Sequence, residues 1–267
     1  MPSDTSTPAL PPAELAKKAA ACRAVEFVQD GMRVGLGTGS TAAYMVARLA
    51  ERVRGEGLRV VGVPTSSRTA EQARALGIRV VTLDQAGWLD LTIDGADEFD
   101  PDLTLVKGGG GAHLQEKVVA AASRRMIVIS DPAKRVAQLG AYPLPVEVLS
   151  FGLASTEGHL RQVLADLGYG PKQITRRMAG LVPFVTDEGN AILDLHMTAI
   201  GDARTLAQAL NQIPGVVENG LFIGLCDLVI IGHSDGTSDL IEAQAGVAAA
   251  MREPLGRQDN PFADIGV

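Results

Sequence analysis

Apolar positions in the first half of the chain fall into short continuous runs separated by stretches with helical spacing. Runs such as MRVGL (32–36) and MIVIS (126–130) are typical of buried strands. Strands that alternate with helices predict a parallel sheet with right-handed crossover connections. The expected strands are 32–36, 59–64, 79–83, 91–94, 103–107 and 126–130, and the expected helices are 14–29, 41–54, 67–77 and 113–125.

After Tyr142 the order of the predicted elements changes. It becomes strand 144–151, helix 155–168, strands 173–178 and 190–196, helix 203–215 and strand 217–224. The order βαββαβ is that of a ferredoxin-like unit. The apolar run DLVIIG (227–232) then returns to the first sheet. We therefore predict an α/β fold, with a Rossmann-like parallel-sheet main domain (1–142 and 218–267) and an inserted ferredoxin-like α+β domain (143–217).

Composition and charge narrow the class of protein. Of the 267 residues 46% are hydrophobic and 21% charged, which is typical of a globular chain. The net charge of −7 argues against a nucleic-acid-binding face, and no apolar run is long enough to span a membrane. Cys22 and Cys226 show no CxxC spacing, which indicates a reduced, cytoplasmic protein. Residues 1–14 lack a signal-peptide pattern, and we expect them and the tail from residue 252 to be irregular.

A glycine-rich turn, GLGTGST (35–41), links an expected strand to an expected helix. Its N–H groups, the helix N-terminus and the hydroxyls of Ser40 and Thr41 suit a phosphate. A tight βα turn with an N-cap serine is the alternative. A dinucleotide site requires an acidic residue at the end of the second strand. That strand ends in VPTS (63–66), so we favour a monophosphate.

An acidic motif, DGADE (94–98), follows another expected strand. Carboxylates at the C-terminal end of a parallel strand point into the crevice where such sheets bind ligands. Asp94 and Asp97 could accept sugar hydroxyls or bind Mg²⁺, or form a solvated turn. Glu98, Asp100 and Asp102 are expected to be surface charges.

Four consecutive glycines follow Lys107 and precede the helix that carries Glu116. Such a run suits a ligand that touches the main chain, with the amides as an oxyanion hole and Lys107 as a nearby cation. The alternative is a flexible loop, with Glu116 paired to Lys117 or an arginine. In SDPAK (130–134), at another strand end, Lys134 could complete a phosphate site.

Together these motifs resemble the type A ribose-5-phosphate isomerase family. The similar stretches run in order between about residues 31 and 232: GLGTGSTA, VPTSSRTAEQARALGI, IDGADE, VKGGGGAHLQEK, ISDPAK, YPLPVEV, VTDEGNAILD and IPGVVENGLF. The resemblance implies that Glu116 is the general base and Lys107 its electrophilic helper. Asp94 and Asp97, with the backbone of Gly95 and Ala96, would hold sugar hydroxyls and assist ring opening. The other residues expected around the substrate are Thr38, Gly39, Ser40, Thr41, Gly108, Gly109, Gly110, Lys134 and Lys17.

The resemblance also implies the reaction and its setting. D-ribose 5-phosphate and D-ribulose 5-phosphate would interconvert through an enediolate, in the non-oxidative branch of the pentose phosphate pathway, without metal or organic cofactor. Members of the family are usually dimers or higher oligomers, and their inserted domain often covers the cleft, so we expect both features here. His113 and Gln115 depart from the family pattern, in which apolar and arginine residues are frequent. An unperturbed glutamate has a pKa of about 4.3, and desolvation in a closed cleft would raise it.

Two other functions are compatible with parts of the sequence. A phosphosugar-sensing domain of a transcription regulator can share the GTGST loop, but the leader and the acidic balance provide no DNA-reading module. A sugar-phosphate deaminase or lactonase typically needs a catalytic histidine. Of the four histidines only His113 lies near the expected site, while His159 and His196 are expected at the surface of the inserted domain.

Overall fold

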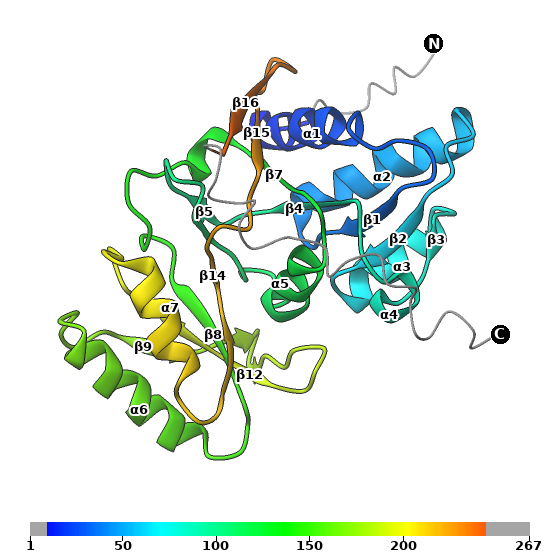
Figure 1. The fold of residues 1–267 in the computed structure, drawn as a ribbon. Helices are drawn as coiled ribbons and strands as arrows, with labels where there is room; N and C mark the ends of the chain where they lie inside the picture. Colours follow the sequence, from blue (N-terminus) through cyan, green and yellow to red (C-terminus); the bar gives the residue numbers. More distant parts are fainter. Residues whose placement is uncertain (1–9, 244–267) are drawn as a thin grey trace, which may run out of the picture.

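The computed structural model describes residues 10–243, which form a large α/β part and a smaller α+β part (Figure 1). The main sheet has seven strands in the order β16-β15-β7-β4-β1-β2-β3, and all neighbours are parallel except β15 and β16. This confirms the Rossmann-like main sheet. Its strands are β1 (Arg33–Leu36), β2 (Val61–Pro64), β3 (Arg79–Val80), β4 (Leu91–Gly95), β7 (Met126–Ser130), β15 (Leu228–Gly232) and β16 (Ser238–Glu242).

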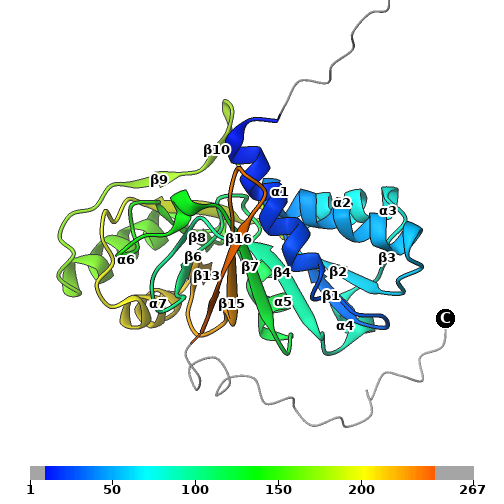
Figure 2. The same cartoon turned by 90° about the horizontal axis from the view of Figure 1, so that it is seen from above.

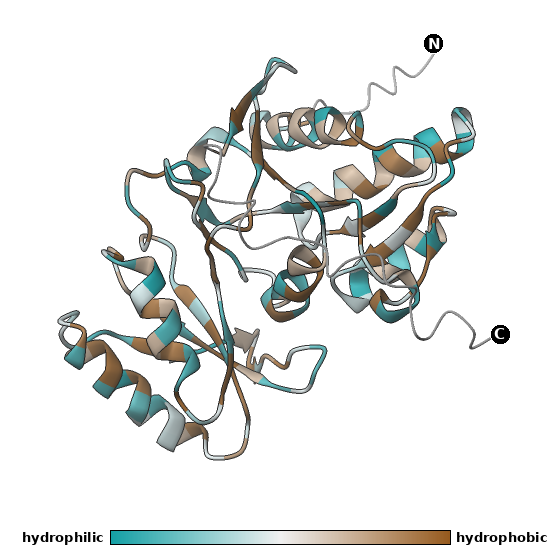
Figure 3. Ribbon diagram, viewed as in Figure 1, coloured by the Kyte–Doolittle hydropathy of each residue, from teal (hydrophilic) through white to brown (hydrophobic). Residues whose placement is uncertain are grey.

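Helices cover both faces of the main sheet (Figure 2). On one face lie α1 (Pro12–Val25), α2 (Ser40–Gly55) and α3 (Ser67–Ala75), and on the other α4 (Leu83–Ala86) and α5 (His113–Ala121). Burial on both sides explains why strands such as β7 are continuously apolar, as Figure 3 shows. The first helix begins at Pro12, because proline suits the first helical turn, and ends at Val25, four residues before the expected end.

The smaller part has the expected ferredoxin-like order. Its sheet is antiparallel with the order β13-β8-β12-β9, and two helices pack their apolar residues against it. The elements are β8 (Leu144–Val148), α6 (Leu153–Asp166), β9 (Ile174–Arg176), β12 (Ala191–Leu195), α7 (Ala203–Asn211) and β13 (Val216–Asn219), with a hairpin of β10 (Met178–Ala179) and β11 (Val182–Pro183). β13 runs past residue 217, and the residue ranges of the two domains stay a prediction.

A three-stranded sheet that the hydrophobic pattern did not predict connects the two parts. It consists of β5 (Glu98–Phe99), β6 (Leu105–Val106) and β14 (Leu221–Phe222) in the order β14-β6-β5. The expected strand 217–224 is therefore divided between β13 and β14, and the segment 103–107 does not join the main sheet. Strands of two residues are too short to show a period in the sequence. β6 leads directly into Lys107.

No helix within residues 10–243 combines the length and the apolar character needed to cross a membrane. The expected irregular tail, and the leader up to residue 9, lie outside the described residues. Residues 12–14, also expected to be irregular, instead form the first turn of α1.

Candidate active site

The predicted site residues meet at the carboxyl edge of the main sheet, between β1 and β4. After β1 the chain proceeds to β2 and β3 on one side, and β4 lies on the other, so this is the point where open α/β sheets bind ligands. A cavity of about 310 Å³ opens there. Every predicted residue except Asp94 lines it: Lys17, Thr38, Gly39, Ser40, Thr41, Gly95, Ala96, Asp97, Lys107, Gly108, Gly109, Gly110, Glu116 and Lys134.

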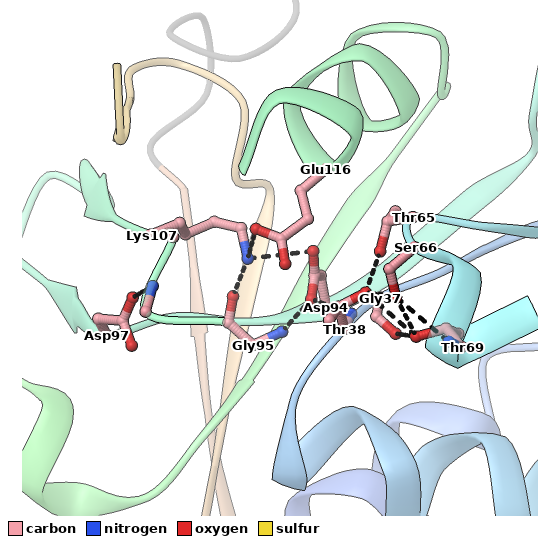
Figure 4. A network of polar contacts seen from close by, with 12 residues as sticks. Gly37, Thr38, Thr65, Ser66, Thr69, Asp94, Gly95, Asp97, Lys107 and Glu116 are labelled. Atoms are coloured by element: carbon pink, nitrogen blue, oxygen red, sulfur yellow. Dashed lines mark hydrogen bonds and ion pairs between the residues drawn. The ribbon is translucent and has the colours of Figure 1, made fainter. Parts of the chain in front are cut away.

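Asp94 belongs to a buried cluster with Lys107 and Glu116, both of which line the cavity (Figure 4). The Lys107 Nζ is 3.0 Å from Asp94 Oδ2 and 3.2 Å from Glu116 Oε2, and it donates a 2.5 Å hydrogen bond to the Gly95 carbonyl. All three side chains are at most 4% exposed. Glu116 therefore pairs with Lys107, not with Lys117, which instead pairs with Glu218 at 2.9 Å.

Burial and mutual charge shift the pKa values of this cluster. Burial, reinforced by the Asp94 carboxylate, raises the pKa of Glu116 to about 8 despite the opposing effect of Lys107. Burial disfavours the charged form of Lys107, but the two carboxylates outweigh it and raise the lysine's pKa. Because two carboxylates share one ammonium, they titrate as a unit. A carboxyl group that changes protonation state near neutral pH suits the uptake and return of a proton.

Asp94 also joins the cluster to the glycine-rich turn after β1. Its Oδ1 accepts hydrogen bonds from the backbone N–H groups of Thr38 at 3.1 Å and Gly95 at 2.7 Å. Gly37 permits this approach, because a Cβ at that position would lie 2.2 Å from Asp94 Oδ1. The buried carboxylate thus fixes the turn relative to Lys107 and Glu116.

A cluster of hydroxyls, Thr38, Thr65, Ser66 and Thr69, supports the same turn. Thr38 Oγ1 lies 2.7 Å from Ser66 Oγ, 2.8 Å from Thr65 Oγ1 and 3.1 Å from Thr69 Oγ1. The cap of α2 is Gly39, whose φ of 121° favours glycine, and it makes no side-chain cap hydrogen bond. The alternative of an N-cap serine in this turn is therefore wrong.

The glycine run after Lys107 is held by protein contacts as well as lining the cavity. The Gly109 N–H donates to Asp97 Oδ2 at 2.7 Å, and a Cβ at Gly109 would lie 2.5 Å from the Tyr142 hydroxyl oxygen. A Cβ at Gly111 would lie 2.3 Å from the Phe184 ring. Only Gly110 has no protein atom closer than 3.7 Å to such a Cβ. The close contacts argue against a flexible loop.

Two expectations about the acidic motif change. Glu98 is buried, not a surface charge, because it accepts hydrogen bonds from the N–H groups of Gly140, at 2.7 Å, and Tyr142, at 2.5 Å. Asp100 is half-buried and accepts from Thr104 and Asp102. Asp94 Oδ1 and Asp97 Oδ2 already accept backbone N–H groups, and Asp94 Oδ2 faces the Lys107 ammonium, which does not favour the magnesium interpretation. Within residues 10–243 no group of three or more histidine, cysteine or acidic side chains is arranged to hold a metal ion.

The histidine alternative finds no support in the geometry. Residues lining the cavity do not include His113, which is fully buried beside Gly108 and lies 3.4 Å from the Glu218 carbonyl oxygen. Burial, together with the charge of Lys117, lowers its pKa to about 3. His113 is therefore neutral and packs behind the glycine run.

Sequence reasoning missed Arg68, Ser130 and Asp131, which also line the cavity. Ser130 ends β7 and Asp131 directly follows it, so their position at a strand end is a usable signal. Arg68 lies in the first turn of α3 and carries no such signal. Lys17 is paired with Glu14 at 2.8 Å, and Lys134 Nζ is 5.9 Å from the centre of the Tyr142 ring.

Known proteins resemble this chain over nearly its full length. A model of the ribose 5-phosphate isomerase A (phosphoriboisomerase A) family matches residues 61–236. The ribose-5-phosphate isomerase A of Cereibacter sphaeroides is 62% identical over 96% of this chain and 98% of its own. The solved ribose 5-phosphate isomerase from Plasmodium falciparum has a TM-score of 0.82 at 35% identity, covering 86% of this chain and 98% of that one. A D-ribose-5-phosphate isomerase solved in complex with phospho-erythronic acid has a TM-score of 0.79 at 35% identity, covering 87% and 100%. The chain therefore belongs to the ribose 5-phosphate isomerase A family.

Proposed function

We propose that this protein interconverts D-ribose 5-phosphate and D-ribulose 5-phosphate. The observation that carries the proposal is the buried pair of Lys107 and Glu116, 3.2 Å apart at the wall of a cavity that also contains a glycine-rich turn suited to phosphate. The pair supplies a base with a pKa near neutrality and a permanent cation at one place.

The reaction moves one hydrogen from C2 to C1 of the open-chain sugar and a second from the C2 hydroxyl to the oxygen on C1. In this mechanism the Glu116 carboxylate removes the C2 proton, which the neighbouring carbonyl makes acidic, and returns it to C1. The enediolate formed in between carries its negative charge on the two oxygens. Lys107 and the N–H groups of the glycine run stabilise that charge.

The phosphate end of the substrate is assigned to the start of α2. Gly39, Ser40 and Thr41 present backbone N–H groups and hydroxyls to the cavity, and the helix N-terminus carries partial positive charge. Lys134 adds a cation on the same wall. Asp97 and the backbone of Gly95 and Ala96 are assigned to the sugar hydroxyls between the two ends. The related enzyme solved with phospho-erythronic acid binds a ligand that also combines a phosphate with hydroxyls.

A phosphosugar sensor would have the same phosphate site but would gain nothing from a perturbed carboxyl group beside a buried lysine. Incubation of the chelator-treated protein with ribose 5-phosphate, followed by detection of the ketose, separates the two functions. Formation of ribulose 5-phosphate supports the enzyme and its independence from metal. Absence of turnover by a folded protein that binds phospho-erythronic acid contradicts it.

The role of Glu116 is tested by Glu116→Gln, which keeps the size and polarity of the side chain. We expect kcat to fall by about 10²–10⁴-fold, because the amide cannot accept the C2 proton. Binding of phospho-erythronic acid should persist. Glu71→Gln is the matched control, since Glu71 is an exposed carboxylate on α3 away from the cavity. Substantial isomerase activity in Glu116→Gln would overturn the assignment.

Three features of the setting remain predictions. We propose that the enzyme acts in the cytoplasm, in the pentose phosphate pathway, and as a homodimer or higher oligomer with the inserted domain as a lid or dimerisation unit. Cys22 is a free thiol, in agreement with a reducing compartment. Mass measurement in solution tests the oligomeric state.

A further inference from the structure

Arg177 connects the smaller part of the molecule to the glycine run. It directly follows β9, and its guanidinium forms a two-point ion pair with Asp194 of β12, with Nε 2.9 Å from Asp194 Oδ2 and Nη2 bonded to Oδ1. The side chains are only 13% and 14% exposed. A planar guanidinium held at two points has a fixed direction, which a lysine would lack.

The remaining nitrogen of this guanidinium reaches the glycine run. Arg177 Nη1 donates hydrogen bonds to the Gly108 carbonyl at 2.5 Å and to the Gly109 carbonyl at 3.4 Å. Two successive peptide carbonyls are thus drawn toward one cation. Glycine has the greatest backbone freedom of any residue, so a run of glycines needs such contacts to keep one conformation.

Fixing a carbonyl also fixes the N–H group on the other side of the same peptide. In a trans peptide the C=O and N–H bonds point in opposite directions. The carbonyl of Gly108 meets Arg177, and the N–H of Gly109 in that peptide meets Asp97. In the next peptide the Gly109 carbonyl meets Arg177, so the Gly110 N–H points away from it. Gly110 lines the cavity, and no acceptor within residues 10–243 takes this N–H.

We propose that Arg177 is a positioning residue, which holds the Gly108 and Gly109 carbonyls so that the Gly110 N–H is aimed at the enediolate oxygen. This inference rests on the proposed isomerase activity. Arg177 itself does not line the cavity. It acts through the glycine run, and it makes catalysis depend on the correct placement of the smaller part of the molecule.

The competing explanation is that Arg177 only attaches the smaller part of the molecule to the larger part. A variant that removes a different contact between the two parts is the control for this explanation. Asp187, in the smaller part, accepts hydrogen bonds from the Ser67 N–H at 2.7 Å and the Ser67 hydroxyl at 3.1 Å. Asp187→Ala therefore weakens attachment without touching the glycine run. Arg176→Gln is a second control, because Arg176 is the exposed neighbour of Arg177 and carries the same charge.

The test compares kcat, KM, Tm and the inhibition constant of phospho-erythronic acid across these variants. For Arg177→Ala we expect kcat to fall about tenfold or more, because a misaligned donor loses part of its effect on the transition state. KM should change by less than about threefold, since the phosphate site is intact. Arg177→Lys should lose less than Arg177→Ala. Asp194→Asn, which keeps the guanidinium but weakens its anchor, should show a smaller loss in the same direction.

Both controls should keep kcat within about twofold of the wild type, even where Asp187→Ala lowers Tm. Wild-type kcat in Arg177→Ala, or an equal loss in Asp187→Ala, would overturn the positioning role. If Arg177→Ala fails to fold, the positioning role is tested with Asp194→Asn and Arg177→Lys. A wild-type kcat in both of these variants would overturn that role. A wild-type protein without isomerase activity would instead refute the proposed function, so the two failures are distinct.

Discussion

Two polar clusters that contribute residues to the cavity wall are both buried but differ in charge. The cluster of Asp94, Lys107 and Glu116 places two carboxyl groups within 3.2 Å of one ammonium. The hydroxyl cluster around Thr38 is neutral, and its members satisfy one another. Burying charge is costly and shifts pKa values, whereas paired hydroxyls cost little. The contrast teaches that the groups with shifted pKa values are concentrated in one cluster, while the adjoining hydroxyl cluster supplies a neutral frame.

Removing the Lys107 ammonium should have the largest effect on activity and stability, because it alters the charged cluster and leaves the hydroxyl cluster intact. Lys107→Met leaves the Asp94 and Glu116 carboxylates buried without a cation. We expect kcat to fall by about 10²–10³-fold, because the enediolate loses its cation. The free energy of unfolding above pH 8 should fall by about 3–5 kcal/mol, as measured by denaturant titration.

Lys117→Met is the matched control for that variant. Lys117 is also largely buried and paired, with Glu218 at 2.9 Å, but it does not line the cavity. Its loss should lower stability while leaving kcat within about twofold of the wild type. Equal effects of the two substitutions on kcat would show that charge burial alone, without position, explains the Lys107 result.

The dependence of activity on pH should show the second-largest effect, because only the charged cluster titrates near neutral pH. With a Glu116 pKa of about 8 in the free enzyme, kcat/KM should fall about tenfold for each pH unit below that value, because only the ionised base reacts. Between the ordinary glutamate pKa of 4.5 and about 8, Glu116 is protonated in the folded state and ionised in the unfolded state. The free energy of unfolding therefore decreases as pH rises through this range. Glu116→Gln removes that loss. Its Tm advantage over the wild type should be larger above pH 8 than at about pH 5.

The smallest effect is expected at the phosphate end. Lys134→Ala should raise KM about tenfold with kcat changed less than about twofold, because a phosphate contact is equally strong in the ground and transition states. Lys18→Ala, an exposed lysine on α1, should change neither constant. If kcat instead fell by a larger factor than KM rose, Lys134 would lie near the reacting carbons.

Sequence reasoning located the site because strand ends are recognisable. Asp94, Thr38 and Lys134 each follow an apolar run, and parallel strands bring their carboxyl ends to one edge. The same argument failed for Lys107, whose strand β6 belongs to a separate small sheet. Lys107 was found only because of the glycines that follow it and the family resemblance.

Contacts that depend on tertiary packing could not be predicted. In the sequence Glu98 is one of several charges in an acidic turn. Its burial depends on a hydrogen bond from the Gly140 N–H, which is distant in the sequence. Arg177 and Phe184 reach the glycine run from about seventy residues further along the chain. No local pattern marks either residue, because each depends on how the inserted part is placed.

The three-stranded sheet of β5, β6 and β14 also constrains how the cleft can open. The chain leaves the main part beside Glu98, which holds the N–H groups of Gly140 and Tyr142, and it returns through β14, which pairs with β6. Both crossings are fastened to the same small sheet, so it should act as the axis of a hinge. A rotation about that axis would move Tyr142 least and would separate Arg177 from the glycine run. The proposed placement of the Gly110 N–H therefore requires the two parts to stand as they do here.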